Sequence, residues 1–327
     1  MMSALIDGIR KGRFAVFGRA GMDMFADPPG TRADEAETFR ADLGGSSANI
    51  CAGLCKLGMQ SALITSVSDD NVGRFCTNRL RHYGVDTRYL KVLDGEYRIS
   101  LAVYESCIED FQLTIYRNNA VDFQVTDDDV DRVDYASFGA LITAGTVFAA
   151  EPSRGSTFRA FENARKAGLP VIFDIDYRPY SWPSPEVASQ VLTRAGEESD
   201  LIVGNDEEFG FMAGGIEKGL DKARDLAAGG KMVIYKMGQA GALTLADGEE
   251  IRTGIYPVTA VKPNGAGDSF MAGLLAAIAE GRPLKEAVLR GSACAAIVVS
   301  QPGCAPAMPT TPELDAFLAA RPGPTDV

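Results

Sequence analysis

The segment 262–275, KPNGAGDSFMAGLL, holds the residues in this sequence that are best suited to chemistry. Gly265, Ala266 and Gly267 are small, and an apolar helical pattern begins directly after them. Backbone without bulky side chains can approach a ligand closely, and the unpaired amides of a helix start attract anions such as phosphate. Asp268 is then a carboxylate beside a phosphate site, where the negative charges of the carboxylate and the phosphate would repel each other. The simplest resolution is that Asp268 takes a proton from a hydroxyl group that attacks phosphorus, which predicts a phosphotransferase.

Other common phosphate-binding and catalytic motifs are absent from the sequence. It contains no G-x-x-x-x-G-K-[ST] loop, no G-x-G-x-x-G after a strand and no H-R-D catalytic loop. The only histidine, His82, lies in the polar stretch LRHYG, which predicts a surface position. A general base is therefore expected to be a carboxylate. Taken alone, however, GAGD could also be an ordinary helix start with an acidic residue near the positive end of the helix dipole.

The composition sets limits on the class of protein. With 327 residues, 46% apolar and 23% charged, the chain suits one large α/β domain or two modest ones. A net charge of −12 disfavours nucleic acid or an anionic membrane as the main partner. No apolar run reaches the roughly 18 residues that span a bilayer, and the N-terminus lacks a signal-peptide pattern, so we expect a cytoplasmic protein. Six cysteines without a C-x-x-C pair are expected to be free thiols: Cys51, Cys55, Cys76, Cys107, Cys294 and Cys304.

Alternating strand and helix patterns must position these groups. The apolar run 14–18 predicts a first buried strand, and from about residue 140 onward short apolar runs alternate with helical patterns. Such alternation predicts an α/β fold with a mostly parallel sheet and helices on both faces. Helices over 267–280 and 284–300 are expected to close the core, and a last short helix is expected to begin at Thr311.

Two segments interrupt this alternation. Residues 97–118 contain two alternating runs joined by the short polar turn CIED, which predicts a β-hairpin. Residues 24–42 are polar and contain Pro28 and Pro29, so we expect a loop followed by an exposed strand. Strands from about 31–43 and 97–118 could form a small separate sheet, or could extend the edge of the main one.

The segment 262–275 resembles, position for position, the C-terminal signature of the ribokinase-like (PfkB) sugar kinases. The run from Gly44 and Gly45 to Asn49 is similar to the sugar-binding motif near the N-terminus of that family. Asp23 falls where the family has an early sugar-binding aspartate. The resemblance covers nearly the whole chain in the expected order. It implies a single ribokinase-like domain over the full chain, acting as an ATP-dependent kinase.

Two further motifs agree with this resemblance. The run Asn205-Asp206-Glu207-Glu208 resembles the family's N-x-x-E motif, and Gly238 and Gly241 match its G-x-x-G nucleotide loop. The resemblance implies that Asn205 and Glu208 serve the nucleotide and its Mg²⁺, with Glu208 acting through water, because Mg²⁺ keeps several of its waters. Taken alone, the acidic run could be the charged first turn of a helix, and the glycines could form an ordinary hairpin turn.

The resemblance gives the remaining motif residues their roles. Asp268 would deprotonate the attacking sugar hydroxyl, and the amides of Ala266, Gly267 and Asp268 would hold the transferring phosphoryl group. Asp23 and Asn49 would hydrogen-bond to sugar hydroxyls. The GGSSAN run that contains Asn49 could otherwise be a simple loop with a helix cap.

Three segments indicate the substrate class. Residues 116–118, 174–182 and 298–310 are similar to members of the family that phosphorylate the 6-hydroxyl of a keto-deoxy sugar acid in inositol catabolism. Kinases of 2-keto-3-deoxygluconate and of fructose are the alternatives within the family. A non-catalytic nucleotide- or sugar-binding module is the alternative from a different class.

An acidic sugar carries a carboxylate, which the planar fork of an arginine suits well. Arg19, Arg117 and Arg178 lie in the stretches that resemble the family, and are the candidates for this contact. Each could instead form a surface ion pair.

The resemblance also implies a lid, a partner and a further ion. In that family the small extra sheet is a lid over the sugar, and in many members two lids pair to form a homodimer. A monovalent cation such as K⁺ is implied beside the GAGD loop. Here the loop is preceded by Lys-Pro-Asn, where many relatives carry Asp-Thr-Thr or similar residues.

Overall fold

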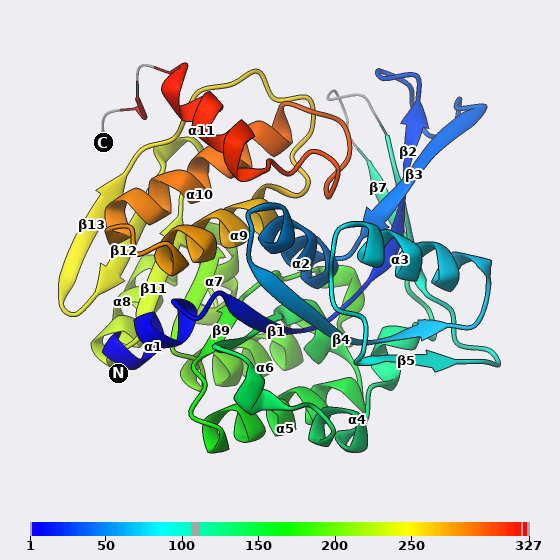
Figure 1. Cartoon of the computed structure of the whole chain (residues 1–327), viewed down its shortest axis with the longest axis horizontal. Helices are drawn as coiled ribbons and strands as arrows, with labels where there is room; N and C mark the ends of the chain where they lie inside the picture. Colours follow the sequence, from blue (N-terminus) through cyan, green and yellow to red (C-terminus); the bar gives the residue numbers. More distant parts are fainter. Residues whose placement is uncertain (1, 106–111, 322, 326–327) are drawn as a thin grey trace.

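The computed structural model describes residues 2–105, 112–321 and 323–325 (Figure 1). The described residues form a nine-stranded sheet in the order β13-β12-β11-β10-β9-β8-β1-β4-β5. From β5 to β11 in this order the strands pair in parallel, and β12 and β13 add antiparallel pairs at the other edge. This confirms the predicted mostly parallel α/β sheet. The strands are β1 (Arg13–Phe17), β4 (Gln60–Ser68), β5 (Leu90–Leu93), β8 (Ala140–Ala144), β9 (Val171–Asp174), β10 (Leu201–Asn205), β11 (Met232–Lys236), β12 (Ala242–Ala246) and β13 (Glu249–Thr253).

Helices cover both faces of this sheet, and each face has its own hydrophobic core. Strand β1 shows how the cores divide, because Phe14 and Val16 belong to one and Ala15 and Phe17 to the other. The first face packs against α1 (Met2–Ile9), α2 (Ser46–Lys56), α3 (Asn71–His82), α9 (Ala266–Ala279), α10 (Leu284–Val299) and α11 (Thr311–Ala319). The second face packs against α4 (Asp127–Asp131), α5 (Ser153–Lys166), α6 (Pro185–Glu197), α7 (Asp206–Ala213) and α8 (Gly219–Ala228).

A second, four-stranded sheet stands apart from the first, at the right of Figure 1. Its order is β3-β2-β6-β7, with strands β2 (Gly21–Asp27), β3 (Thr38–Gly44), β6 (Ser100–Tyr104) and β7 (Leu113–Tyr116). The sequence predicted β3, β6 and β7 but expected loop at most of β2. Asp23 explains the miss, because this carboxylate takes an inward position, where it is only 1% exposed, and interrupts the apolar alternation. The expected CIED turn lies outside the described residues.

Several single-residue expectations can be compared with the structure. Cys51, Cys55, Cys76, Cys294 and Cys304 are free thiols, as expected, and Cys107 lies outside the described residues. His82 ends α3 on the surface. The last helix is capped by Thr310 rather than Thr311, because the side chain of Thr310 forms a capping box with Glu313. In the described ranges, no helix is both long and apolar enough to cross a membrane.

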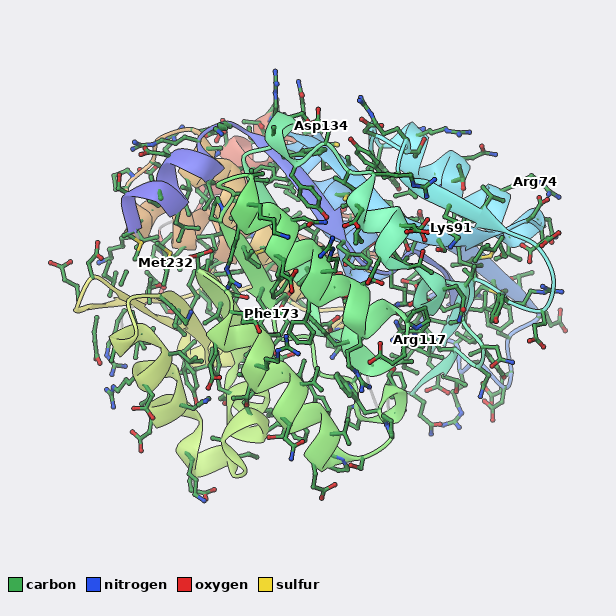
Figure 2. The ribbon with its side chains drawn as sticks, turned by 90° about the horizontal axis from the view of Figure 1, so that it is seen from below. Arg74, Lys91, Arg117, Asp134, Phe173 and Met232 are labelled. Carbon is green, nitrogen blue, oxygen red and sulfur yellow. The ribbon has the colours of Figure 1, made fainter. Side chains whose placement is uncertain are left out.

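Four phenylalanines form the centre of the second core, on the side of the molecule seen in Figure 2. Phe148 lies among Phe158, Phe161 and Phe173, with ring centroids 5.0 to 6.0 Å apart and mostly edge-to-face. Such pairs contribute about 0.5–1.5 kcal/mol beyond the burial of their area. Phe148, in the turn after β8, therefore packs between α5 and strand β9 of the sheet.

Replacing Phe148 with alanine should lower the free energy of unfolding by about 3–5 kcal/mol, because the substitution leaves a cavity that this core cannot close. Urea denaturation followed by circular dichroism measures the effect. The control is Val92→Ala, whose side chain is 60% exposed and which should change stability by less than about 0.5 kcal/mol. Similar losses in the two variants would contradict the packing described for Phe148.

Candidate active site

A cavity of about 1780 Å³ lies between the two sheets. Asp174, Asn205 and Lys236, the last residues of β9, β10 and β11, line it from the main sheet. Asp23 and Tyr104 line it from the second sheet. Ligands in open α/β sheets bind outside the carboxyl ends of parallel strands, and the cavity occupies this position. The start of α9 and the residues before it close one side of the cavity.

The start of α9 has the geometry of an anion site. Gly265 is its N-cap in the left-handed region, with φ of 79°, and it provides no side chain to accept from the first amides of the helix. A Cβ on Gly265 would lie 3.1 Å from the sulfur of Cys304, so glycine is needed here for space as well as for conformation. Ala266, Gly267 and Asp268 all line the cavity. The first amides of α9 are therefore available to a ligand.

Asp268 faces this cavity and is held in place by α2. The side-chain amide of Asn49 donates a hydrogen bond to Oδ2 of Asp268 at 2.9 Å, although the two residues are 219 positions apart. Burial, together with the nearby carboxylate of Asp176, raises the pKa of Asp268 to about 6, while the Asn49 hydrogen bond opposes this shift. The opposite end of the Asn49 amide, Oδ1, is buried without a hydrogen-bond partner among the described residues. Asp268 and Asn49 are thus brought together, and Asn49 keeps an acceptor free.

Asp23 lies on the other side of the cavity. Burial raises the pKa of its carboxyl group to about 7, and the charge of Arg19 opposes this effect. Oδ1 of Asp23 has no hydrogen-bond partner among the described residues. A Cβ on Gly44 would lie 1.9 Å from that oxygen, so only glycine fits beside it. Gly45 also needs to be glycine, since its φ is 95° and a Cβ would lie 2.4 Å from the Arg19 carbonyl oxygen.

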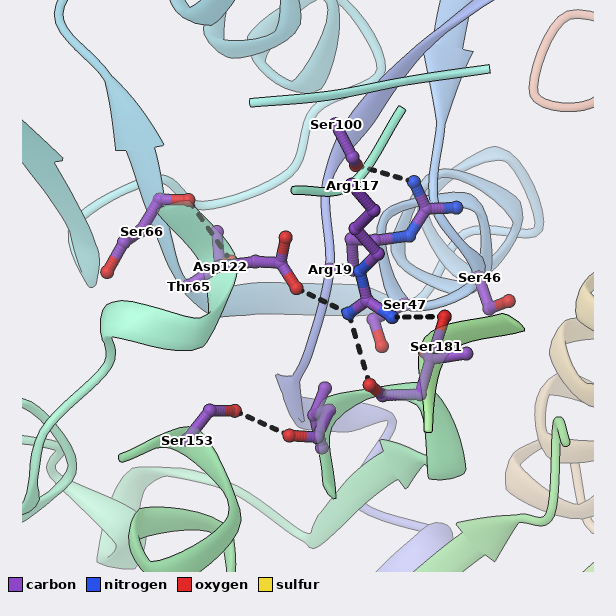
Figure 3. Close-up of polar contacts among 12 residues, drawn as sticks. Arg19, Ser46, Ser47, Thr65, Ser66, Ser100, Arg117, Asp122, Ser153 and Ser181 are labelled. Atoms are coloured by element: carbon purple, nitrogen blue, oxygen red, sulfur yellow. Dashed lines mark hydrogen bonds and ion pairs between the residues drawn. The ribbon is translucent and has the colours of Figure 1, made fainter. Parts of the chain in front are cut away.

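The three candidate arginines differ in position. Arg19 is buried, lines the cavity and donates from Nη1 to Oγ of Ser100 at 2.6 Å (Figure 3). Arg178 lines the cavity from the loop after β9, and its Nη2 lies 2.9 Å from Oδ1 of Asp176. Arg19 and Arg178 can therefore reach a ligand in the cavity.

Arg117 is placed differently and is not among the residues that line the cavity. Its side chain is 6% exposed and forms a 2.5 Å ion pair with Asp122. It also donates to the Thr146 carbonyl at 3.1 Å and to Ser181 Oγ at 3.3 Å (Figure 3). The ion pair holds Arg117 behind the cavity wall, where it fixes the loop that carries Ser181.

Asp176 is a site residue that the sequence reasoning missed. Its Oδ2 accepts from Ser46 Oγ at 2.7 Å and from Thr146 Oγ1 at 3.4 Å, while its Oδ1 pairs with Arg178. It adopts a φ of 35°, unusual for a non-glycine residue. Asp176 thereby joins the start of α2 to the Arg178 loop. Its place two residues after a buried strand was the available signal.

Asn205 and Glu208 form a reciprocal cap at the start of α7. The side-chain oxygen Oδ1 of Asn205 accepts from the backbone N–H of Glu208. In return, Oε2 of Glu208 accepts from the backbone N–H of Asn205, and both distances are 2.8 Å. The helix-start interpretation is therefore confirmed. Both residues also line the cavity, and their role toward the nucleotide and Mg²⁺ stays a prediction. Burial raises the pKa of Glu208, and the charge of Lys236 lowers it.

The remaining wall of the cavity is suited to a nucleotide base. Gly238 and Gly241 form the turn between β11 and β12 and line the cavity, so they too are both turn and wall. Beyond them the lining is mostly apolar, from the loop after β13 and from α10: Ile255, Tyr256, Pro257, Val258, Ala260, Ala295, Ala296 and Val299. An apolar slot beside a few fixed polar groups is typical of small-molecule sites.

Lys262 supports the loop that leads into α9. Its side chain is buried, and Nζ donates to the carbonyl oxygen of Asn264 at 2.6 Å. Burial lowers the pKa of Lys262, and nearby acidic groups, including Asp268 and Asp23, oppose this effect. The Lys-Pro-Asn departure from the family pattern therefore places a lysine ammonium on a carbonyl of this loop.

Comparisons with known proteins identify the class of enzyme that has this fold. The sequence profile of the pfkB family carbohydrate kinases matches residues 11–311. The chain belongs to this family and is a sugar kinase.

Individual relatives cover almost the whole chain. A 5-dehydro-2-deoxygluconokinase of Geobacillus thermodenitrificans is 35% identical over 94% of this chain and 95% of its own. One from Photobacterium profundum is 36% identical over 94% of each. Among solved structures, a fructokinase of Vibrio cholerae O395 bound to fructose, ADP and calcium superposes with a TM-score of 0.81. Its identity is 25%, and the match covers 94% of this chain and 98% of that one.

The Asn49 contact gives a prediction about Asp268 alone. Replacing Asn49 with alanine should raise the pKa of Asp268 by about one unit, because a charge-assisted hydrogen bond to the ionised carboxylate is lost. Carbon-13 NMR of aspartate-labelled protein measures the titration, with the resonance assigned by Asp268→Asn.

A matched control for this titration is Cys55→Ala. Cys55 lies on α2 like Asn49, but it does not contact Asp268. The control should leave the pKa of Asp268 as it is in the wild type. An unchanged titration in Asn49→Ala would show that the amide does not stabilise the ionised form of Asp268.

Proposed function

We propose that this enzyme transfers the γ-phosphoryl group of ATP to the 6-hydroxyl of 5-dehydro-2-deoxy-D-gluconate, a step of myo-inositol catabolism. The observation that carries the proposal is the placement of Asp268 at an open helix start, facing a cavity that also holds Arg19 and Arg178. The names of the relatives at 35–36% identity support the same sugar acid. We place the reaction in the cytoplasm, whose reducing conditions suit the free thiols.

In this proposal Asp268 accepts the proton of the attacking hydroxyl. With a pKa of about 6 it is mostly ionised at neutral pH yet basic enough to share a proton, so kcat/KM should fall as the pH drops below about 6. The amide of Asn49 holds the carboxylate in position. The amides of Ala266, Gly267 and Asp268 stabilise negative charge on the transferring group, because they already point at it before reaction.

The sugar acid is expected to bind on the opposite side of the cavity. Asp23, with an unpaired oxygen, accepts from a sugar hydroxyl, and Asn49 Oδ1 accepts from another. Arg19 and Arg178 bind the carboxylate, because a guanidinium matches it in charge and shape. Arg117 takes part only indirectly, through its contact with the Ser181 loop beside Arg178.

The nucleotide is expected along the apolar wall, with its phosphates reaching α9. When bound with ATP, Mg²⁺ would neutralise phosphate charge. Among the described residues, no group of three or more His, Cys, Asp or Glu side chains is arranged to hold a metal by itself. This fits Mg²⁺ held by phosphate oxygens and water, with Glu208 at the outer sphere. Pairing of two small sheets into a homodimer and a monovalent cation beside the GAGD loop stay predictions.

Fructose is the second candidate substrate, because the solved structure named above holds it. A coupled ADP-release assay over 5-dehydro-2-deoxygluconate, 2-keto-3-deoxygluconate and fructose distinguishes them. The highest kcat/KM is expected for 5-dehydro-2-deoxygluconate. Binding of ATP with no turnover on any sugar would instead indicate a non-catalytic binding module.

Replacing Asp268 with asparagine should lower kcat by about 10²–10⁴-fold, because the base is lost while the shape is kept. ATP affinity, measured by calorimetry, should change little. Asp34→Asn, on the exposed surface, is the matched control and should retain full activity. A kcat near the wild-type value in Asp268→Asn would exclude this residue as the base.

Replacing Arg178 with alanine should weaken binding of the sugar acid by about 10- to 100-fold, because a charge-assisted contact is lost. Binding of a neutral sugar such as fructose should fall much less. The comparison uses KM for both substrates, with Arg224→Ala as control because Arg224 pairs with Glu250 at the surface. Equal losses for acid and neutral sugar would contradict carboxylate recognition by Arg178.

A further inference from the structure

Lys236 is a cation in the cavity that neither the motifs nor the family resemblance pointed out. It is the last residue of β11, half-buried, and it lines the cavity. Within the part of the chain that the structure describes, its ammonium forms no hydrogen bond or ion pair. Two other charged groups of the cavity have partners, since Arg178 pairs with Asp176 and Glu208 accepts from the backbone amide of Asn205.

The ammonium of Lys236 lies against the first turn of α9. A Cβ added to Gly267 would be 3.5 Å from Nζ, which places the ammonium in contact distance of the anion site. Nζ also lies 5.8 Å from the centre of the Phe270 ring, one turn further along α9. Because Gly267 has no side chain, the ammonium of Lys236 and the first residues of α9 line the cavity side by side.

Three carboxylates of the cavity interact with the charge of this ammonium, and none of them forms an ion pair with it among the described residues. Burial raises the pKa of Asp174 from β9, Glu208 from α7 and Asp268 from α9, and the charge of Lys236 opposes this rise in each of them. The lysine thus offsets negative charge at the end of the cavity where a phosphate is to bind. A half-buried ammonium that lacks a partner in the protein can gain one from a ligand anion, and phosphate oxygens are suitable acceptors.

We propose that Lys236 is a catalytic residue that contacts the phosphoryl group during transfer. This rests on the proposed function, in which the sugar 6-oxygen attacks the γ-phosphorus at the start of α9. A bond forms between that oxygen and phosphorus, the bond from phosphorus to the β,γ-bridging oxygen breaks, and ADP leaves with the electron pair. The hydroxyl proton passes to Asp268. Lys236 exchanges no proton in this step and acts through its charge, beside the amides of Gly267 and Asp268.

The position of Lys236 on β11 supports this assignment. The turn that contains Gly238 and Gly241 follows directly, and it lines the nucleotide side of the cavity. The parallel pairing of β11 with β10 sets Lys236 beside Asn205, at the same edge of the sheet. A rigid strand end therefore fixes both the lysine and the nucleotide turn, and no movement of the second sheet is needed to bring the ammonium to α9.

The test compares Lys236→Met with wild type and with Lys285→Met, an exposed lysine on α10. We expect Lys236→Met to lower kcat by about 10²–10³-fold with the sugar KM nearly unchanged, because only the transition state loses charge stabilisation. Lys236→Arg should recover part of the loss. The acid limb of kcat/KM should move to higher pH in Lys236→Met, because Asp268 loses a neighbouring positive charge.

A second measurement follows the transition state directly. The affinity for ADP with aluminium fluoride and sugar, a mimic of the transferring group, should fall in Lys236→Met by a factor comparable to that in kcat. Affinity for ADP alone should change little. If Lys236→Met does not fold, Lys236→Gln replaces it, with circular dichroism as the check.

The outcomes separate this proposal from the function it rests on. An inactive Asp268→Asn together with a Lys236→Met whose kcat is within about threefold of wild type would overturn only the role of Lys236. A loss confined to the sugar KM, or an acid limb that does not move, would also overturn it. Full activity of Asp268→Asn would instead overturn the proposed base.

Discussion

The site depends on keeping several carboxylates partly or fully out of water where the two sheets meet. Asp23, Asp174, Asp176 and Glu208 are all buried, and Asp268 faces the same cavity. Burying an ionised group is costly unless nearby charges or hydrogen bonds compensate. Cations at the same place provide this compensation: Arg19, Arg178 and Lys236. The cavity thus holds a network of buried carboxylates and cations that compensate one another's charge.

This network requires close approach of backbone from distant parts of the chain. Gly44 leaves room for the Asp23 carboxylate, Gly45 for the carbonyl oxygen of Arg19, and Gly265 for the side chain of Cys304. Each glycine belongs to a different contact, yet all three serve the same cavity. Larger side chains at these positions would separate the charges from the ligand or from one another. Packing and electrostatics therefore impose the same residue choice.

The sequence predicted the elements whose signals are local. The parallel sheet, α9 with its glycine-rich start, and three of the four strands of the second sheet were found from apolar periodicity and turn residues. The contact of Asn49 with Asp268 was not predictable from periodicity, because it joins two helices 219 residues apart. Lys236 was missed because it is a single polar residue at the end of β11, and Asp176 because it lies two residues beyond the end of β9. Only the sheet order shows that these ends converge on one cavity.

The arginines show why residue type does not determine role. Arg19, Arg117 and Arg178 were equivalent candidates in the sequence, yet Asp122 takes the guanidinium of Arg117 and leaves the other two in the cavity. Arg19 lies in the three residues between β1 and β2, and its Nη1 contacts Ser100 on β6. Its position therefore depends on how the second sheet packs against the first. In the proposed function Arg19 binds the sugar acid, so sugar binding would depend on the relative placement of the two sheets. The small sheet would then contribute to recognition of the sugar as well as to covering the cavity.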